Sequence, residues 1–238
     1  MRQAKEAIVR RQPGRPGRDE PDGALLLLRE AQTAFARSGY NATTLRGIAA
    51  AAGVDHTLVI HHFSSKESLW SAVIERLADY LAPFVRDLND LQSQTTIPVR
   101  MRIETAFRLL VTAIFGEPDC GLLLSRISSE RGKHLDLLVE KLLRPYHDAL
   151  CPLLVEGVQA KVIKKQGVEL LYFMIINAVT MSVSYRHLLA YFDDSSQNMA
   201  QLERDMTQFL IVNFLDNPSS KSHKTSVRSQ QLHSSKAG

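Results

Sequence analysis

The side chains that could carry out chemistry are few, and they are poorly grouped for catalysis. The chain has eight histidines and two cysteines, and it contains no HExxH, nucleophile-elbow, Walker-loop or CxxC pattern. His61 and His62 are adjacent, and neighbouring side chains on a helix diverge by about 100°, so they make a poor metal-binding pair. His147, Asn177 and Tyr185 could support acid–base chemistry, but no carboxylate cluster accompanies them. We therefore expect no enzyme, no bound metal and no cofactor.

The residues from Asp55 to Leu58 combine polar and apolar side chains that could contact DNA bases if they began a helix that enters a major groove. Asp55 is a good helix cap, so His56, Thr57 and Leu58 would lie at the front of a helix. His56 could donate a hydrogen bond to guanine N7 or O6, and the Thr57 methyl group and Leu58 could contact a thymine methyl group. The alternative is that each is a surface residue that contacts only the DNA backbone.

Short helices must position these residues. A first helix is expected after Asp22 and ends at Gly39, a second begins near Thr43 or Thr44 and closes at Gly53, and a third begins at Asp55. The apolar residues of the first two helices recur at helical spacing: Leu28, Ala31, Phe35, Leu45, Ile48, Ala49 and Ala52. Val59 and Phe63, four residues apart, would hold the third helix against the first two. Two short helices joined by a Gly-containing turn make a helix-turn-helix, whose second helix can enter a major groove.

A long fourth helix is predicted to follow directly. Ser64 and Glu67 have the spacing of a capping box, in which both side chains satisfy amides at a helix start. We expect this helix to run toward Pro83, where it ends or kinks.

The rest of the chain also has a helical pattern. Further helices are expected near 97–116, 119–130, 134–160, 167–192 and 197–215, and no convincing alternation typical of strands occurs. The sequence therefore predicts an all-α fold, in which a three-helix DNA-binding domain precedes a larger helical domain.

Both ends of the chain have compositions that disfavour packing. Residues 1–21 are rich in Arg, Pro and Gly, and we expect a flexible basic arm in which Arg15 or Arg18 could enter a narrow A·T minor groove. The alternative is a solubilising tail. Residues 216–238 are rich in Ser, Lys and His with few large apolar residues, which predicts a disordered tail.

The bulk composition agrees with an anionic partner but does not identify it. The formal net charge is +4 and the pI is about 9.1. Cys120 and Cys151 are too few for a disulfide framework, so we expect core thiols in a reducing cytoplasm. The longest uncharged stretch, 170–185, is shorter than the ~20 residues that cross a bilayer, so no membrane partner is expected.

Four short segments carry a resemblance to a known family. They are Gly39–Ala49 (GYNATTLRGIA), Ala52–Val54 (AGV), His61–Phe63 (HHF) and Ser65–Leu69 (SKESL). Together they resemble the N-terminal DNA-binding domain of the TetR family of repressors, over about residues 22–80. The resemblance implies a helix-turn-helix domain at 22–68 and a regulatory and dimerisation domain at 69–215. It also implies a bacterial cytoplasmic protein associated with the nucleoid.

The resemblance also implies particular DNA contacts. Thr43 and Thr44 would offer a hydroxyl cap and free amides to a phosphate, and Lys66 resembles a backbone-binding lysine of the family. The full set of DNA-contacting positions implied by the matched motif is Thr43, Thr44, Arg46, Asp55, His56, Thr57, Leu58, Ile60, His61, His62 and Lys66. Three of these positions depart from the family pattern: Asp55 replaces Ser, Thr57 replaces a small residue such as Gly, and Ile60 replaces a Tyr that would bond a phosphate.

The larger domain would supply a dimer surface and a regulatory site. In TetR-like proteins the last two long helices pair with their symmetry mates, which here points to Phe173, Ile176, Met206, Phe209 and Leu210; the alternative is ordinary monomer core. A small-molecule effector of unknown identity would bind in the same domain. The candidate pocket residues are Phe107, Phe115, Tyr146, His147, Phe173, Asn177 and Met181, each of which could instead be packed core.

The functional prediction is a sequence-specific transcriptional regulator. It would bind a palindromic double-stranded DNA operator as a homodimer, act as a repressor, and be released by the effector. Two alternatives are a regulator without a small-molecule ligand and a non-specific DNA-binding protein that uses only the basic arm.

Overall fold

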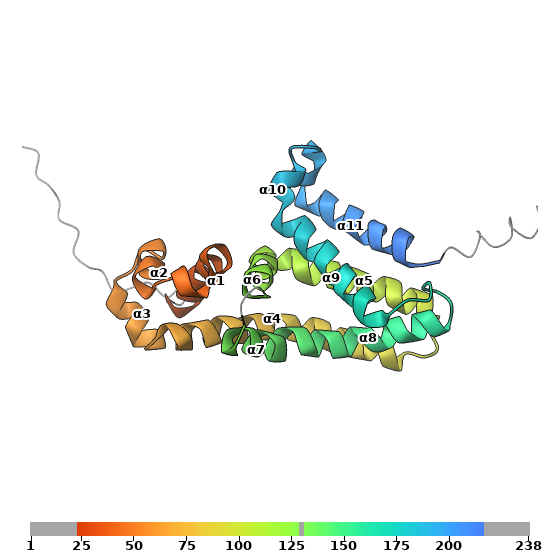
Figure 1. Cartoon of the computed structure of the whole chain (residues 1–238), viewed down its shortest axis with the longest axis horizontal. Helices are drawn as coiled ribbons and strands as arrows, with labels where there is room; N and C mark the ends of the chain where they lie inside the picture. The colour runs from red at the N-terminus through yellow and green to blue at the C-terminus, as the bar shows by residue number, and fades with distance from the viewer. Residues whose placement is uncertain (1–22, 129–130, 217–238) are drawn as a thin grey trace, which may run out of the picture.

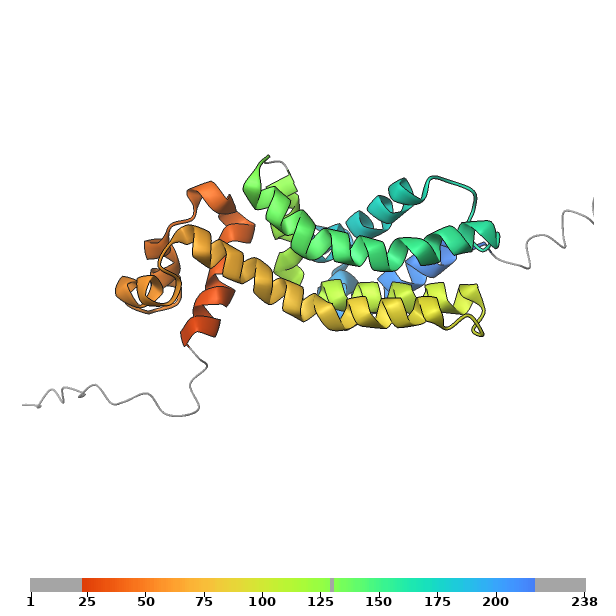
Figure 2. The same cartoon turned by 90° about the horizontal axis from the view of Figure 1, so that it is seen from below.

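The computed structural model describes residues 23–128 and 131–216, and its regular elements there are helices (Figure 1). The first four are α1 (Gly23–Ala42), α2 (Leu45–Ala51), α3 (His56–Phe63) and α4 (Lys66–Ser93). Helices α1 to α3 pack at one end of α4, and α4 then continues into the rest of the molecule (Figure 2). The described part confirms the predicted all-α fold.

Local signals set the boundaries of the short helices, as the sequence predicted. Thr44 caps α2 by accepting a hydrogen bond from the Gly47 amide, and Asp55 caps α3 by accepting one from the Thr57 amide. The φ angle of Gly39 is 80°, which breaks the helical path inside α1. The φ angle of Gly53 is 66° in the α2–α3 turn, a conformation that favours glycine.

Two details of α4 differ from the prediction. The helix is capped by Ser65, whose Oγ accepts from the Ser68 amide, so the predicted capping box of Ser64 and Glu67 is wrong. Glu67 instead bonds to side chains of other elements. Of the two predicted outcomes at Pro83, an end or a kink, the end is wrong, because the helix continues to Ser93 with buried leucines on its later turns.

The body consists of the remaining elements: α5 (Val99–Gly116), α6 (Pro118–Ser128), α7 (Lys133–Leu138), the π-helical turn η1 (Val139–Leu143), α8 (Arg144–Gln159), α9 (Val168–Ser184), α10 (Arg186–Leu189), the 3₁₀ turn η2 (Asp194–Gln197) and α11 (Met199–Phe214). The predicted helix 134–160 therefore contains a π-helical turn. The predicted helix 167–192 is interrupted at Tyr185. Three residues earlier, the Ser182 hydroxyl donates a hydrogen bond to the Val179 carbonyl oxygen, and it thereby competes with backbone amides for this acceptor.

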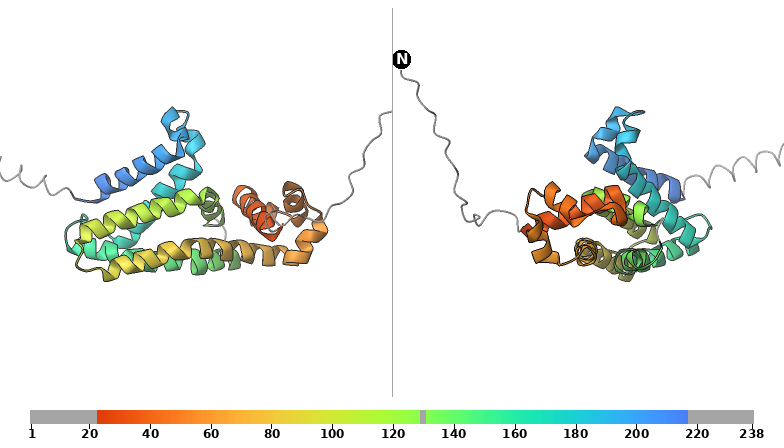
Figure 3. Two further views of the ribbon diagram at one scale, coloured as in Figure 1. Left: turned by 180° about the vertical axis from the view of Figure 1, so that it is seen from behind. Right: turned by 60° about the vertical axis from the view of Figure 1, so that its left-hand side comes forward.

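Two hydrophobic cores hold the elements together. The N-terminal core joins α1, α2 and α3 to the first half of α4, as far as Leu77, and it includes Leu123 and Ile127 of α6 and Leu138 at the end of α7. The second core joins α5, α8, α9 and α11 to the end of α4. Because α4 and α6 take part in contacts on both sides, the DNA-binding end is packed directly onto the body (Figure 3).

The predicted arm, with Arg15 and Arg18, and the predicted tail beyond Asp216 lie outside the described residues. Within them, no helix is long and apolar enough to span a membrane. Cys120 and Cys151 are both free thiols.

Candidate DNA-binding surface and ligand cavity

Helix α3 is held by one deeply buried side chain and presents most of its polar face outward. Val59 is fully buried in the N-terminal core, and Phe63 packs against the same core. Thr57, His61 and His62 are exposed, and Ile60 is 41% exposed. This arrangement leaves two turns of helix free to contact a partner.

The start of α3 is fixed by Asp55. Its Oδ1 accepts hydrogen bonds from both the amide and the hydroxyl of Thr57, at 2.8 and 2.5 Å. These two bonds hold the pKa of the exposed Asp55 carboxyl below its ordinary value. Because the Thr57 hydroxyl is bonded to Asp55, its methyl group is the part available for an apolar contact.

The other two predicted base-reading residues are half-buried. Leu58 lies beside the start of α1, where its Cδ2 is 3.9 Å from the position that a Cβ on Gly23 would take. His56 is the first residue of α3 and is also partly covered. Of the three, Thr57 therefore has the most open position.

The two predicted phosphate-site threonines have different surroundings. Thr43 is 5% exposed and its hydroxyl donates to the Gly39 carbonyl oxygen at 2.7 Å, so this hydroxyl faces inward and not toward a phosphate. Thr44 is exposed and caps α2. Arg46, in the first turn of α2, is exposed as well.

Lys66 bridges the DNA-binding helices. Its ammonium donates to the carbonyl oxygens of Tyr40 and Thr43, both at 3.0 Å, and lies 4.4 Å from the centre of the Tyr40 ring. It thereby satisfies carbonyl groups where α1 ends and stabilises the junction with α4. The sequence pattern identified the residue but not these intramolecular bonds.

Glu67 joins the same junction to α7, which sequence reasoning missed. Its carboxylate accepts from the Tyr40 hydroxyl at 2.8 Å and contacts Lys133 at 3.0 Å and His134 at 3.1 Å. Hydrogen bonds from Lys133, Tyr40 and His134 lower the pKa of Glu67 to about 2. Burial and the neighbouring Glu67 raise the pKa of Tyr40 to about 12. These contacts link residues far apart in the sequence, so no local pattern could predict them.

A second joint connects α1 and α4 to α6. The Glu117 carboxylate accepts from Arg76 at 2.9 Å and from Gln32 at 3.1 Å, and the Thr33 hydroxyl donates to Asp119 at 2.7 Å. Burial alone would raise the pKa of Glu117, but hydrogen bonds from Arg76 and Gln32 and the Arg76 charge hold it below its ordinary value. These bonds connect the start of α6 directly to α1 and α4.

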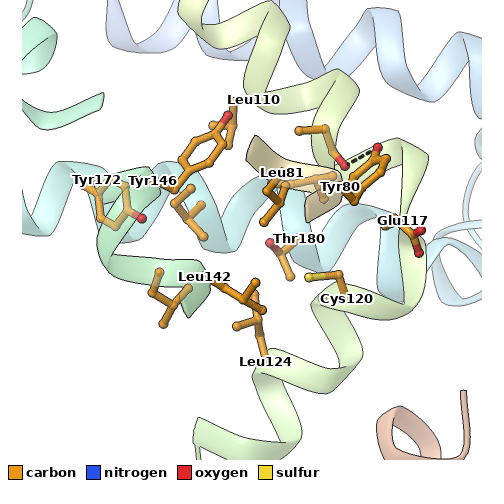
Figure 4. A pocket seen from close by; sticks show the side chains of 15 residues that line it. Tyr80, Leu81, Leu110, Glu117, Cys120, Leu124, Leu142, Tyr146, Tyr172 and Thr180 are labelled. Carbon is orange, nitrogen blue, oxygen red and sulfur yellow. Dashed lines mark hydrogen bonds between the residues drawn. The ribbon is translucent and has the colours of Figure 1, made fainter. Parts of the chain in front are cut away.

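A cavity of about 50 Å³ lies between α4, α5, α6, η1, α8 and α9. Its walls are mainly aliphatic and aromatic side chains (Figure 4). Tyr80 and Cys120 lie on one side of the cavity and Tyr146 and Tyr172 on the other. The Tyr146 hydroxyl is buried and has no hydrogen-bond partner among the described residues, which is a cost unless something else bonds it.

The predicted pocket residues separate into three groups. Tyr146 lines this cavity, whereas Phe173, Asn177 and Met181 line a neighbouring pocket of about 200 Å³ that shares part of its wall. The others lie elsewhere: Phe107 and Phe115 are buried core residues, and His147 bonds to acidic side chains outside both pockets. Their helical periodicity identified inward positions but not which of them meets a cavity.

The predicted dimer residues fall into an exposed group and a buried group. Phe173 of α9 is 64% exposed and Phe209 of α11 is 48% exposed, while Ile176 is half-buried. Met206 and Leu210 are buried within the chain, so the structure assigns these two to the monomer core instead. Further exposed apolar residues that the prediction missed are Leu170, Met174, Leu188, Tyr191, Phe192 and Val212.

Comparison with known proteins agrees with the motif. Residues 27–73 match the model of the bacterial regulatory proteins of the tetR family. The chain is 38% identical over 96 residues to the HTH-type transcriptional activator FasR of Mycolicibacterium smegmatis, covering 40% of this chain and 41% of FasR. It is 33% identical over 111 residues to the HTH-type transcriptional repressor KstR2 of Rhodococcus jostii, covering 46% of this chain and 50% of KstR2. The chain thus spans half or less of the length of these relatives.

Solved structures extend the likeness to the body. The hemolysin II transcriptional regulator HlyIIR superposes with a TM-score of 0.60 at 18% identity, over 82% of this chain and 98% of HlyIIR. FadR from Bacillus subtilis, solved in complex with stearoyl-CoA, superposes with a TM-score of 0.55 at 18% identity, over 79% of this chain and 97% of FadR. At this identity the likeness concerns the fold alone. Residues 27–73 therefore form a helix-turn-helix segment of the kind found in the bacterial regulatory proteins of the tetR family.

Proposed function

We propose that this protein is a sequence-specific transcriptional repressor that binds a palindromic operator as a homodimer and is released by a small-molecule effector. The observation that carries the proposal is the exposed, mainly polar outward face of α3. This helix is capped by Asp55, anchored by the buried Val59, and lies within the segment that matches the family model. Such a helix fits the major groove of DNA.

We expect two kinds of contact with DNA: contacts to phosphates, which position the protein, and contacts to bases, which read the sequence. Thr44 and Arg46 would contact phosphates from the first turn of α2, and His61 and His62 from the last turn of α3. Base reading would fall to His56 and Thr57, with Leu58 and Ile60 adding apolar contacts. Lys66 would contribute charge near the backbone and brace the junction at the same time. Arg15 and Arg18 of the arm would add minor-groove contacts.

The dimer would form through α9 and α11. Each carries large apolar side chains exposed to water in the single chain, with Phe173, Met174 and Val212 all more than half exposed. Exposed apolar groups of this size mark interaction surfaces. Two copies related by a two-fold axis would cover them and present two copies of α3 to successive half-sites.

The effector would occupy the cavity behind α6. Its lining requires a largely apolar molecule, and the unpartnered Tyr146 hydroxyl favours a ligand with one hydrogen-bonding group. The related fold of FadR holds stearoyl-CoA, so an acyl thioester is a reasonable first probe. A regulator without an effector would leave this cavity and hydroxyl unexplained.

Binding in the cavity would reach the DNA-binding helices through α6. Cys120 and Gly121 line the cavity, and the adjacent Glu117 and Asp119 bond to α1 and α4. A Cβ on Gly121 would lie 2.5 Å from Thr180 Cγ2, so α6 packs closely against α9. An effector that displaces α6 would act on α1 through the bonds of Glu117 and Asp119. A coupling of about 1–3 kcal/mol would change operator affinity about 5–150-fold.

Selection of bound sequences from random double-stranded DNA tests the DNA-binding part of the proposal. The full chain should return an inverted repeat. His56→Ala should relax the preference at one position of each half-site, at a cost of about 1–3 kcal/mol. Arg46→Ala should weaken all sites alike and reduce the salt slope by about one unit for each phosphate that it no longer neutralises. An enrichment without symmetry, or identical effects of both variants, would overturn the assignment.

Operator release tests the effector part. Stearoyl-CoA, stearate and free coenzyme A are titrated into the protein–operator complex. An apolar effector predicts that the acyl compounds release DNA and that coenzyme A alone does not. If none of the three alters either operator binding or thermal stability, acyl compounds are excluded as the effector class.

A further inference from the structure

Outside both pockets, nitrogen, sulfur and oxygen ligand atoms come together where α8 meets α9. One atom each from His147, Cys151 and Glu169 lies within 4.8 Å of the other two. His147 and Cys151 are four residues apart on α8 and so share one helix face, and Glu169 is in the first turn of α9. Cys151 is buried, whereas the Glu169 side chain is 78% exposed, so the group lies at the protein surface with its sulfur inside.

The imidazole of His147 is already oriented as metal-binding imidazoles are. Its Nδ1 bonds to Asp148 Oδ1 at 2.8 Å, and its Nε2 faces Glu169 Oε2 at 2.7 Å. Metal-bound histidines usually donate their second ring N–H to a carboxylate in this way, which fixes the tautomer and the ring orientation. With Nδ1 donating to Asp148, the Nε2 lone pair is directed toward the group of ligand atoms.

We propose that His147 Nε2, Cys151 Sγ and a Glu169 carboxylate oxygen form a zinc site, with Asp148 orienting the imidazole. Zinc bonds of about 2.0–2.3 Å place tetrahedral ligand atoms roughly 3.3–3.8 Å apart. The ligand atoms lie within 4.8 Å of one another, and the Glu169 side chain, which is 78% exposed and bonded only to His147 among the bonds described above, can rotate to reach this geometry. Three protein ligands leave the fourth position to water.

The donor set selects the class of metal. Thiolate and imidazole ligands favour zinc and other borderline-soft divalent ions over Mg²⁺ and Ca²⁺, which prefer oxygen. The ion would tie α8 to α9 beside Tyr172, whose ring meets the His147 ring edge-on at 5.0 Å and lines the cavity. The site does not depend on the function proposed above, since cobalt absorption and zinc affinity report the metal directly.

Cobalt substitution identifies the sulfur ligand. Co²⁺ is added to the reduced full-length protein, and absorption is followed in the visible d–d region and in the near-ultraviolet thiolate-to-cobalt charge-transfer region. We expect intense tetrahedral bands that saturate at one equivalent and are abolished by Zn²⁺. Cys151→Ser should remove the charge-transfer band, and the matched control Cys120→Ser should keep it. Retention of the band in Cys151→Ser, or its absence from the parent protein, would overturn the site.

Zinc affinity, measured by competition with a chromophoric chelator, tests the remaining ligands. Glu169→Gln alters only an exposed side chain and so leaves the fold intact, yet it should weaken Zn²⁺ binding at least tenfold. Asp148→Asn should weaken it about 10–100-fold, as expected for a partner that orients a ligand. A Glu169→Gln affinity equal to that of the parent would place the zinc elsewhere, for example on other histidines, and reject the proposal.

Discussion

The outward faces of α3 and of α9 differ in chemistry although both helices rest on a buried apolar side. The outward face of α3 carries Thr57, His61 and His62, whereas that of α9 carries Leu170, Phe173 and Met174. A polar helix face is stable in water and suited to phosphates and base edges. An apolar face of this size is unfavourable in water until another surface covers it. The difference fits the two partners proposed above, DNA at one end of the molecule and a second copy of the chain at the other.

The two ends are also specified differently. Caps and turn residues within a few positions fix α3, and Val59 anchors it. Helix α9 has no side-chain cap and breaks at Tyr185, and its position depends on packing against α6 and α8. Four substitutions test this contrast, from the largest expected effect to the smallest.

Phe173→Asp should dissociate the dimer. A well-packed aromatic residue at an interface contributes about 2 kcal/mol or more, and a two-fold interface contains it twice, so the dissociation constant should rise roughly a thousandfold. Sedimentation velocity over a range of concentrations measures the change. Met101→Asp on α5 is the control, because Met101 is 57% exposed but lies outside α9 and α11. An unchanged dimer in Phe173→Asp would mean that α9 faces solvent or a different partner.

Val59→Ala should destabilise the DNA-binding end by about 2 kcal/mol. It removes two methyl groups from a fully buried site and leaves a cavity. The neighbouring Ile60→Ala should change stability by less than about 0.5 kcal/mol, because Ile60 is on the exposed side. Urea unfolding of both variants provides the comparison. Equal losses would contradict the orientation of α3.

Tyr146→Phe should stabilise the ligand-free protein by about 1 kcal/mol. The substitution removes a buried hydroxyl without a partner among the described residues and keeps the ring packing. Thermal and urea unfolding without added ligand measure the effect, with the exposed Tyr191→Phe as the control. A loss of stability would show that the hydroxyl has a partner in solution and would remove one argument for a polar group on the effector.

Glu67→Gln should lower stability by at most about 1 kcal/mol, and only at the higher pH values. The pKa of Glu67 in the folded protein, about 2, is below the ordinary 4.5. The contribution of the carboxylate is therefore complete above about pH 5 and is lost as the pH falls toward 2. The difference in unfolding free energy between parent and variant should shrink over that range. Glu75→Gln, exposed on the same helix, is the control, and a pH-independent difference would reject the role of the ion pairs.

Local patterns predicted the helix-turn-helix well. Thr44, Asp55 and Gly53 act through hydrogen bonds and backbone angles within a few residues, so their effect can be deduced without knowing the fold. The capping box was wrong because Ser65 takes the capping role one residue later and Glu67 finds stronger partners in α7. Thr43 shows the same limit, since its spacing suits a phosphate site but its hydroxyl bonds within the core.

The body was predicted as a set of helices, but its sites only in part, since Tyr146 lines the cavity whereas Phe107 and Phe115 belong to the core. Periodicity distinguishes inward from outward positions on one helix, and it placed Phe107, Tyr146 and Phe173 on apolar faces. Whether such a residue fills a core, lines a cavity or meets water depends on which helices lie opposite, and those helices are distant in the sequence.

The sequence alone determined the type of elements, the start and end of the short helices and the residues at the front of α3. Only the tertiary structure decided that α6 connects the cavity to α1, that Met206 and Leu210 belong to the monomer core, and that His147 meets Glu169. The physical reason is the separation along the chain of the residues that interact. Caps and turns are settled by bonds between near neighbours in the chain, whereas cavities, joints and interfaces arise from packing between helices that fold together from distant positions.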